Sequence, residues 1–466
     1  KLKNKVNFIW YESVDEDPIK VFTRLNIGKI TLTNSELIKA LFLNRSNFAG
    51  KSMDSLKLGQ QEIATEWDKI EYTLQSDEFW LFLHDKGYDR PTRIDFIFDL
   101  ICNENTLDIE SLNKEDEKVI GTDEYRTFRY FYEYFKSSHQ NENNDEKKQL
   151  QKTERAWQIV KSYFQTFNEW YDDLVLYHYV GFLLAVGSIS IEQLVNFWKA
   201  KKDKKEFVRY LKDEIKKAIG DNGTDYQYKE DGSDKTKCRS LLLFHNIQTV
   251  INQNHAQRSN DKYKIGTFYK FPFHLYKLEG WDVEHINSST NNPEEDDDTR
   301  KEWLVNVYLS ADEVTQKDII KYFDTEDDGA KGLLFENIKN GIKESIYEDP
   351  EVWTPEEKNR IWNYALLDSS TNRSYGNAIF SAKRRVIIGK DQGRLIPVPR
   401  VLKNGKISVD KESKYATSSF VPPCTKQVFM KYYSSAISKS NYWTKADAEA
   451  YKNDIDSCLE KLDQNN

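Results

Sequence analysis

Apolar residues that recur with helical spacing are the feature that most restricts the fold of this chain. Side chains three or four residues apart share one face of an α-helix, and an apolar face of this kind is normally buried. Two long stretches follow that spacing: Ile63, Trp67, Ile70 and Leu74, and then Trp157, Val160, Phe164, Phe167 and Tyr171. A further helix is predicted after Thr33, where Thr33 and Glu36 fit a capping box. The sequence therefore predicts a mainly α fold.

The composition supports a globular fold and excludes several classes of protein. Hydrophobic residues make up 38% and aromatic residues 14% of the 466 residues, whereas Gly and Pro number only 19 and 10. These values exclude collagen-like, fibrous and wholly disordered chains. The net charge of −8 excludes a basic coat for nucleic acid but leaves room for a local basic cleft.

The cysteines are far apart in the sequence and form no C-x-x-C pair, which favours neither a disulfide framework nor a zinc ribbon. They are Cys102, Cys238, Cys424 and Cys458. Cys238 with His245 is only a weak metal pair, and we expect no zinc there. Thiols without such patterns are typical of a reducing compartment, so a cytoplasmic protein is expected.

One uncharged stretch, Leu174–Ile191, is long enough to be weighed as a membrane span. It contains His178 together with several tyrosines, glycines and serines, and two aspartates precede it. A buried helix that ends near Gly187 fits these residues better, and Ser190 can cap the helix that follows. We therefore expect a soluble protein with no membrane partner.

The kind of residue and the apolar spacing change twice along the chain, which predicts three regions. Residues 1–45 are a short mixed segment, and residues 46–237 carry the helical patterns. Residues 238–466 form a small α+β part with a long insertion around residues 290–355. At its start, residues 241–251 (LLLFHNIQTVI) are rich in β-branched and aromatic residues and are predicted to be short strands or irregular core.

The last region contains an acid next to a histidine, followed by two asparagines: Glu284, His285, Asn363 and Asn372. In a strand, Glu284 and His285 point to opposite faces, so both serve one site only if the strand ends there. A neutral imidazole can take a proton from water, and the Glu284 and Asn372 oxygens suit Mg²⁺. Asn363 can hold the imidazole through a hydrogen bond. Together these residues suit phosphodiester hydrolysis.

At these positions the sequence resembles the HNH (ββα-metal) nuclease domain of GmrSD-type restriction endonucleases. The shared pattern is E-H-I, then N-x-x-L-L-D, then N-R-S-x-x-N-x-x-F-x-x-K-R. The matching positions are Glu284, His285, Ile286, Asn363, Leu366, Leu367, Asp368, Asn372, Arg373, Ser374, Asn377, Phe380, Lys383 and Arg384. The layout is also similar to HNH domains of RNA-guided nucleases, in which an Asn replaces the third metal-binding His.

The resemblance implies a role for each matching polar residue. His285 would be the general base, and Glu284 and Asn372 would bind Mg²⁺ or Mn²⁺. Asn363 would orient His285. The residues expected to contact DNA phosphate are Asn377, Lys383 and Arg384. The chain is then expected to be an HNH-type DNA endonuclease, a restriction or anti-phage effector that acts on foreign or modified DNA.

Residues Asp17–Leu43 resemble the end of the GmrS-like domain of the same family, which has a ParB/sulfiredoxin-type fold. In the family that domain binds or hydrolyses nucleotide through a D-G-Q-Q-R motif, which this sequence lacks. No nucleotide-binding residue is therefore predicted. Because the sequence begins without Met, we expect further residues upstream in the full protein.

Departures from the family pattern keep a second function open. The family commonly has Pro-Gln after H-I-x, whereas this chain reads HINSSTNNPEEDDD. The acidic run at residues 294–298 is expected to be a loop near the phosphate path. His285 and Asn363 are also 78 positions apart, a long insertion. The alternative is a modification-sensing or scaffold protein with a silent nuclease site. The sequence leaves open the DNA modification read, the number of strands cut and the oligomeric state.

Overall fold

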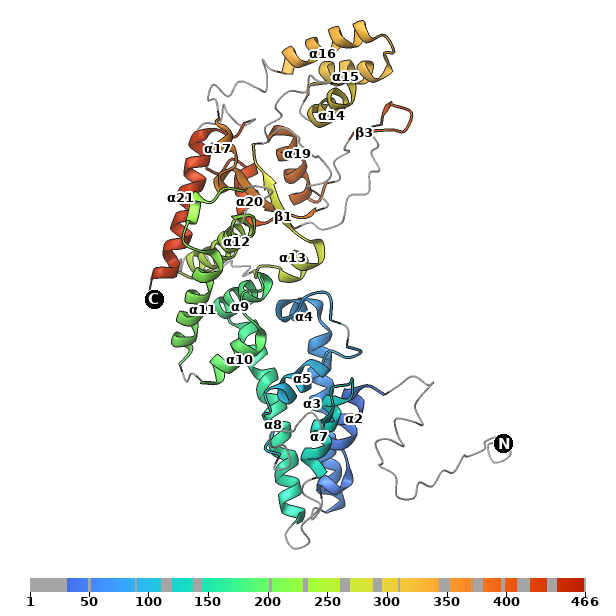
Figure 1. The fold of residues 1–466 in the computed structure, drawn as a ribbon, viewed down its shortest axis with the longest axis vertical. Coiled ribbons are helices and arrows are strands. Elements are labelled where there is room, and N and C mark those ends of the chain that lie inside the picture. The colour runs from blue at the N-terminus through green and yellow to red at the C-terminus, as the bar shows by residue number, and fades with distance from the viewer. Residues whose placement is uncertain are drawn as a thin grey trace, which may run out of the picture. The chain divides into compact units, whose positions relative to one another are not determined.

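Helices make up most of the chain in the computed structural model (Figure 1). The described residues are 32–48, 52–88, 90–109, 120–136, 145–200, 203–228, 234–259, 269–287, 296–308, 311–342, 353–369, 371, 380–394, 399–408, 420–433 and 442–464. Within them, the strands form two two-stranded sheets. The prediction of a mainly α fold with a small sheet-containing part is confirmed. Most of the segment that resembles a GmrS-like domain lies outside the described residues.

Two compact units divide the chain at points that differ from the predicted regions. The first unit comprises Lys1–Ser76 and Tyr88–Phe167, and the second comprises Asp77–Gly87 and Asn168–Asn466. One long helix, α8 (Asp145–Asp172), contributes to both units. Because the apolar pattern of α8 continues through the boundary, the sequence gives no sign of it.

The described part of the first unit is a group of helices. They are α2 (Asn34–Phe42), the 3₁₀ turn η1 (Arg45–Phe48), α3 (Met53–Gln75), α5 (Asp95–Asn103), α7 (Arg126–Lys136) and most of α8. The predicted capping box of Thr33 and Glu36 is present at the start of α2. The predicted apolar face of α3 is buried: Ile63, Trp67, Ile70 and Leu74.

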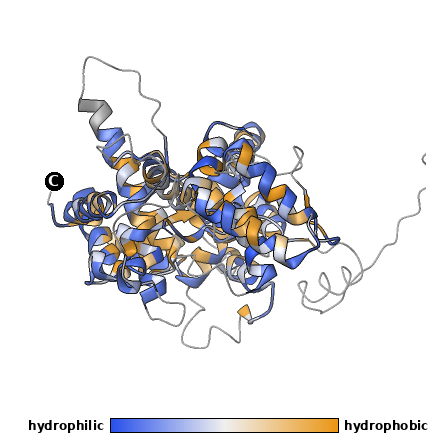
Figure 2. Ribbon diagram, turned by 90° about the horizontal axis from the view of Figure 1, so that it is seen from above, coloured by the Kyte–Doolittle hydropathy of each residue, from blue (hydrophilic) through white to orange (hydrophobic). Residues whose placement is uncertain are grey.

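Large aromatic side chains fill the space between these helices. The Trp67 and Trp157 rings are stacked with their centroids 5.9 Å apart, and Phe42 meets Trp157 edge-on at 5.4 Å. Figure 2 shows hydrophobic and hydrophilic positions interspersed along the helices of the chain. Burial of this apolar surface, at about 25 cal/mol per Å², is the main stabilising contribution to such a core.

The second unit contains most of the described helices and all of the described strands. Its helices are α4 (Asp77–Leu83), the end of α8, α9 (Leu174–Ala185), α10 (Ile191–Ala200), α11 (Lys204–Ile219), α12 (Asp234–Ser259), α13 (Phe273–Glu279), α14 (Asp297–Tyr308), α15 (Glu313–Asp324), α16 (Asp328–Ile342), α17 (Pro355–Lys358), α19 (Phe380–Asp391), α20 (Pro423–Phe429) and α21 (Lys445–Asp463), with the 3₁₀ turns η2 (Gly223–Asp225) and η4 (Ile361–Asn363). Helix α12 contacts α9, α11, α20 and α21, so it is central to this unit.

The long uncharged stretch is the buried helix that its sequence predicts. Helix α9 begins after Asp173, whose carboxylate accepts hydrogen bonds from the first turn, and it ends just before Gly187, which has φ +66°. The Ser190 hydroxyl then accepts from the Gln193 N–H at the start of α10. No helix among the described residues is long and apolar enough to cross a membrane.

The prediction for residues 241–251 is wrong, because they lie in the middle of helix α12. Every residue from 240 to 251 is buried. A helix that is surrounded on all sides has no polar face, so the 3.6-residue period that marks helices is absent from its sequence.

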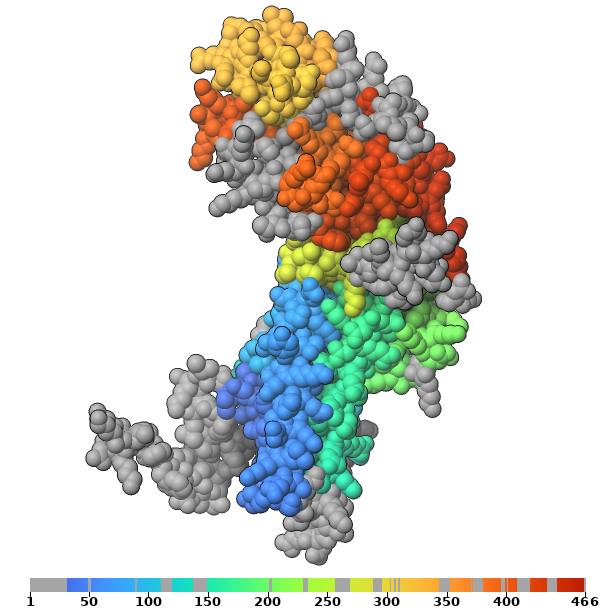
Figure 3. Space-filling model, turned by 180° about the vertical axis from the view of Figure 1, so that it is seen from behind, coloured from blue at the N-terminus to red at the C-terminus, as the bar shows by residue number. Residues whose placement is uncertain are grey.

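The predicted α+β part contains a strand pair with a helical insertion. Strands β1 (Asp282–His285) and β2 (Tyr364–Leu367) are antiparallel, with His285 opposite Tyr364. Helices α14, α15 and α16 lie between them in the sequence and pack on one another (Figure 3). A second short pair, β3 (Arg400–Val401) and β4 (Ile407–Ser408), is also antiparallel.

Candidate functional site

The acid and the histidine of the predicted site lie at the end of β1. The strand ends at His285, as a shared site requires. Glu284 is buried and faces helix α19, whereas His285 is half-buried and contacts β2. These contacts lie on different elements, as expected for neighbouring strand residues.

His285 is held by a tyrosine. The Tyr364 hydroxyl and His285 Nε2 are hydrogen-bonded at 2.6 Å. Burial, followed by the charges of Lys383 and Lys358, lowers the pKa of His285 to about 4. Burial also raises the pKa of Tyr364. At pH 7 the imidazole is therefore neutral and the phenol is protonated.

Lys383 does not occupy the position predicted for it. Its side chain is fully buried, and its ammonium group donates to Glu284 Oε1 at 2.5 Å and to the His285 carbonyl at 2.7 Å. Burial lowers the pKa of Lys383, and the Glu284 carboxylate counteracts this shift. The prediction that Lys383 contacts DNA phosphate is wrong for this structure, because the amine faces the strand end and not solvent.

A second lysine links α19 to the end of β2. Lys390 is seven residues after Lys383, two helical turns along the same face, and it forms an ion pair with Asp368, just after β2. Lys390 also donates to the Thr371 hydroxyl at 2.7 Å. Helix α19 is thus tied to the ends of both strands, which gives a strand–strand–helix arrangement.

The two arginines that follow Lys383 differ in exposure. Arg384 is half-buried, and its Nε has no hydrogen-bond partner among the described residues, whereas Arg385 is exposed. Both are better placed than Lys383 to meet a phosphate. The sequence pattern favoured Lys383 because helical position alone does not reveal which side of α19 is buried.

Asn363 supports the chain after His285 and does not bind the imidazole. Its amide accepts from the Asn287 N–H and donates to the Asn287 carbonyl, both at 3.0 Å. It also donates to the Lys358 carbonyl at 2.9 Å. The implied hydrogen bond from Asn363 to the imidazole is therefore not formed. Tyr364, which lies directly opposite His285 in the antiparallel pair, makes that contact. Sequence reasoning missed it because no local pattern reveals this pairing.

Two predicted residues lie outside the described residues: Asn372 and Asn377.

Part of the acidic run, Asp297 and Asp298, is described, and for these two residues the expectation of a loop is wrong. Asp297 and Asp298 form the first turn of α14, where negative charge is favourable. Asp297 pairs with Lys301 and Lys331.

The described residues offer an incomplete set of ligands for Mg²⁺. Glu284 supplies one carboxylate, whose Oε1 is bonded to Lys383. In the part of the chain that the structure describes, no group of three His, Cys, Asp or Glu ligand atoms surrounds it. Mg²⁺ prefers six oxygen ligands, several of them water, so this carboxylate needs further oxygens such as the Asn372 amide.

Comparison with known proteins adds no relative. No family model, no curated protein and no solved structure matches this chain. The functional assignment therefore depends on the geometry of the chain and on its sequence pattern.

Proposed function

We propose that this chain is a metal-dependent endonuclease of the HNH type that hydrolyses DNA phosphodiester bonds. One observation carries the proposal: a neutral His285 lies next to Glu284 at the end of β1, and two ion pairs join this strand pair to helix α19. A strand–strand–helix unit with this pair at its centre is the arrangement that the HNH resemblance implies.

His285 is the proposed general base. Its ring is neutral at pH 7, so it can accept a proton from an attacking water. A base with a pKa near 4 is weak, but a phosphodiester anion that approaches the ring favours the protonated form and raises the pKa. The Tyr364 hydroxyl fixes the ring orientation during this transfer.

Glu284 and Asn372 are the residues proposed to hold Mg²⁺ or Mn²⁺. When bound, the cation would stabilise the charge that develops on the leaving oxygen. Glu284 Oε1 accepts a hydrogen bond from the Lys383 ammonium group. Lys383 then serves to position Glu284, and Arg384 is the proposed phosphate contact.

The biological role proposed is a restriction or anti-phage effector in the cytoplasm that acts on foreign or modified DNA. This role rests on the resemblance to GmrSD-type enzymes alone. Since the D-G-Q-Q-R motif is absent from the sequence, nucleotide regulation is not assigned to this chain.

Plasmid nicking tests the proposal. We expect the protein to nick supercoiled DNA in the presence of Mg²⁺ or Mn²⁺, and His285→Ala to lower the rate by about 10²–10⁴-fold while DNA affinity changes little. His274→Ala, in the same unit but on α13, is the matched control and should retain the activity.

The scaffold alternative is favoured by one observation, the ion pair that engages Glu284 with Lys383. If it is correct, the wild-type protein and His285→Ala will be equally inactive with both metals and several kinds of DNA.

A further inference from the structure

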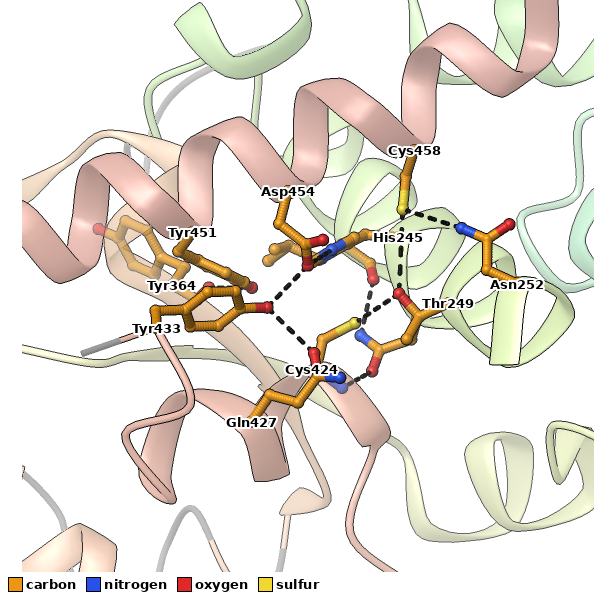
Figure 4. A network of polar contacts seen from close by, with 12 residues as sticks. His245, Thr249, Asn252, Tyr364, Cys424, Gln427, Tyr433, Tyr451, Asp454 and Cys458 are labelled. Carbon is orange, nitrogen blue, oxygen red and sulfur yellow. Dashed lines mark hydrogen bonds and ion pairs between the residues drawn. The ribbon is translucent and has the colours of Figure 1, made fainter. Parts of the chain in front are cut away.

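A second group of reactive side chains lies where α12, α20 and α21 meet (Figure 4). His245 is contributed by α12, Cys424 by α20, and Asp454 and Cys458 by α21. His245 and both cysteines are buried, and Asp454 is half-buried. Three separate segments of the chain thus bring an imidazole, two thiols and a carboxylate together.

The distances among three members of this group suit a metal site. One ligand atom each from His245, Asp454 and Cys458 lies within 4.8 Å of the others. The Cys424 thiol lies beside the His245 ring. Both thiols also contact the same Thr249 hydroxyl, at 3.3 Å for Cys424 and 3.9 Å for Cys458.

One atom of this group has no hydrogen-bond partner among the described residues. His245 is fully buried, and its Nδ1 has no hydrogen-bond partner among the described residues. A buried polar atom without a partner costs about 1–3 kcal/mol. The other ring nitrogen, Nε2, is 2.9 Å from Asp454 Oδ2.

The aspartate is also held in place by its neighbours. The Tyr433 hydroxyl donates to Asp454 Oδ2 at 2.7 Å, which leaves Oδ1 without a described hydrogen-bond partner. The Asp454 carboxylate is thereby held close to His245 and Cys458.

We propose that His245, Cys424, Asp454 and Cys458 form a binding site for one thiophilic divalent metal ion, of which Zn²⁺ is the best match. Imidazole, thiolate and carboxylate are the ligands of tetrahedral zinc, at about 2.0–2.3 Å from the ion. Binding breaks the two S–H bonds, forms two metal–sulfur bonds and releases both thiol protons to solvent. The inference of a metal site does not depend on the proposed nuclease function.

Such a metal would stabilise the layer beneath β2. The Thr425 hydroxyl, next to Cys424, donates to the Leu366 carbonyl at 2.5 Å. The Tyr451 hydroxyl on α21 donates to the Tyr364 carbonyl at 3.2 Å. A metal that joins α20 and α21 to α12 therefore fixes the strand whose Tyr364 contacts His285, which indicates a structural role.

The test is a direct metal measurement on the full chain. Protein purified without chelators should contain close to one equivalent of Zn²⁺ by elemental mass spectrometry. After removal of the metal under reducing conditions, titration with Co²⁺ should produce thiolate-to-cobalt charge-transfer absorption and saturate at one equivalent. Cys424→Ser and Cys458→Ser should each weaken Co²⁺ binding at least about tenfold, since each removes a soft ligand.

Cys238→Ser is the matched control, because Cys238 is fully buried on the same helix as His245; it should bind Co²⁺ like the wild type. The proposal is overturned if folded wild-type protein, checked by circular dichroism, neither contains metal nor gives the charge-transfer band. It is also overturned if Cys424 and Cys458 are found joined in a disulfide, or if Cys238→Ser loses the metal and Cys458→Ser retains it.

Discussion

At the scale of single residues, His178 shows how burial fixes the charge of a side chain. The ring is fully buried in α9. Its Nε2 accepts from the Phe271 N–H at 2.9 Å, so the proton is on Nδ1, which donates to the Leu174 carbonyl at 2.6 Å. Protonation of Nε2 would break the first of these bonds.

This arrangement predicts a stability that depends on pH. Burial lowers the pKa of His178 from 6.5 to about 4. Between these values the unfolded state binds more protons than the folded state, so stability falls as the pH decreases from 6.5 toward 4. The loss attributed to this residue is about 3 kcal/mol at most. Urea unfolding at pH 7 and pH 4.5 measures it.

The comparison for this prediction is between His178→Gln and His255→Gln, because His255 is exposed. His178→Gln should be less stable than the wild type at pH 7 but should lose less stability on acidification. His255→Gln should follow the wild type. An identical pH dependence in all three proteins would show that the pKa of His178 is the same in the folded and unfolded states.

At the scale of elements, one close approach of two helices depends on a glycine. A Cβ atom at Gly181 of α9 would lie 2.2 Å from the Phe273 ring of α13. Gly181→Ala is therefore expected to destabilise the protein by about 1–3 kcal/mol, the usual cost of overpacking. Gly332→Ala in α16, where a Cβ meets nothing within 4 Å, should instead stabilise it by up to about 1 kcal/mol. Thermal unfolding of both variants tests whether the lack of space around Gly181, and not helix propensity, determines the effect of Gly181→Ala.

The attachment of α19 gives a second prediction at this scale. Asp368 and Lys390 are an ion pair with little exposure, so Lys390→Met leaves a buried carboxylate without its main partner. We expect a loss of about 3–5 kcal/mol, part of which the double variant Asp368→Asn/Lys390→Met restores. Lys452→Met, which breaks the more exposed pair with Asp456 on α21, should cost less than about 1 kcal/mol. Equal losses for both lysines, measured by urea unfolding, would contradict this account.

Elements with one buried face were predictable from the sequence. Of the two helices with stretches buried on all sides, α9 was also predicted, from its uncharged length and its end signals, whereas the middle of α12 was not. The capping residues of α2 and α10 and the glycine after α9 mark helix ends through local backbone chemistry. Helix α12 lacks a polar face, so its pattern resembles a strand. At the candidate site, Glu284 and His285 were found because they are adjacent in the sequence. The contact of Tyr364 with His285 depends on the pairing of two strands, and the two residues are 79 positions apart. No local pattern reveals that pairing.

At the scale of the whole molecule, the second unit depends on a short helix from early in the chain. Helix α4 belongs to this unit although the segments before and after it belong to the first. Its Phe82 ring stacks on Tyr177 of α9 at 4.8 Å and lies 6.4 Å from the Phe273 ring of α13. The boundary was not predictable, since contacts between distant segments define it.

A fragment of residues 168–466 lacks α4 and should therefore expose an apolar surface on α9 and α13. We expect this fragment to bind a hydrophobic dye strongly and to aggregate, because large exposed apolar patches associate. A synthetic peptide of residues 77–87 should reduce the dye fluorescence, whereas a peptide of the same composition in scrambled order should not. Dye binding as low as that of the full chain would show that α4 is dispensable.

The distance along the chain between β1 and β2 has a consequence for how the protein folds. Closing a loop costs more entropy as the loop lengthens, by about 0.6 kcal/mol for each doubling. A strand pair whose members are 79 residues apart is therefore entropically unfavourable to form at the start of folding. Helices α14, α15 and α16 pack on one another within that loop and shorten the flexible chain once they are folded. We therefore expect these helices to form before the strand pair, so that the candidate site assembles late on the folding pathway.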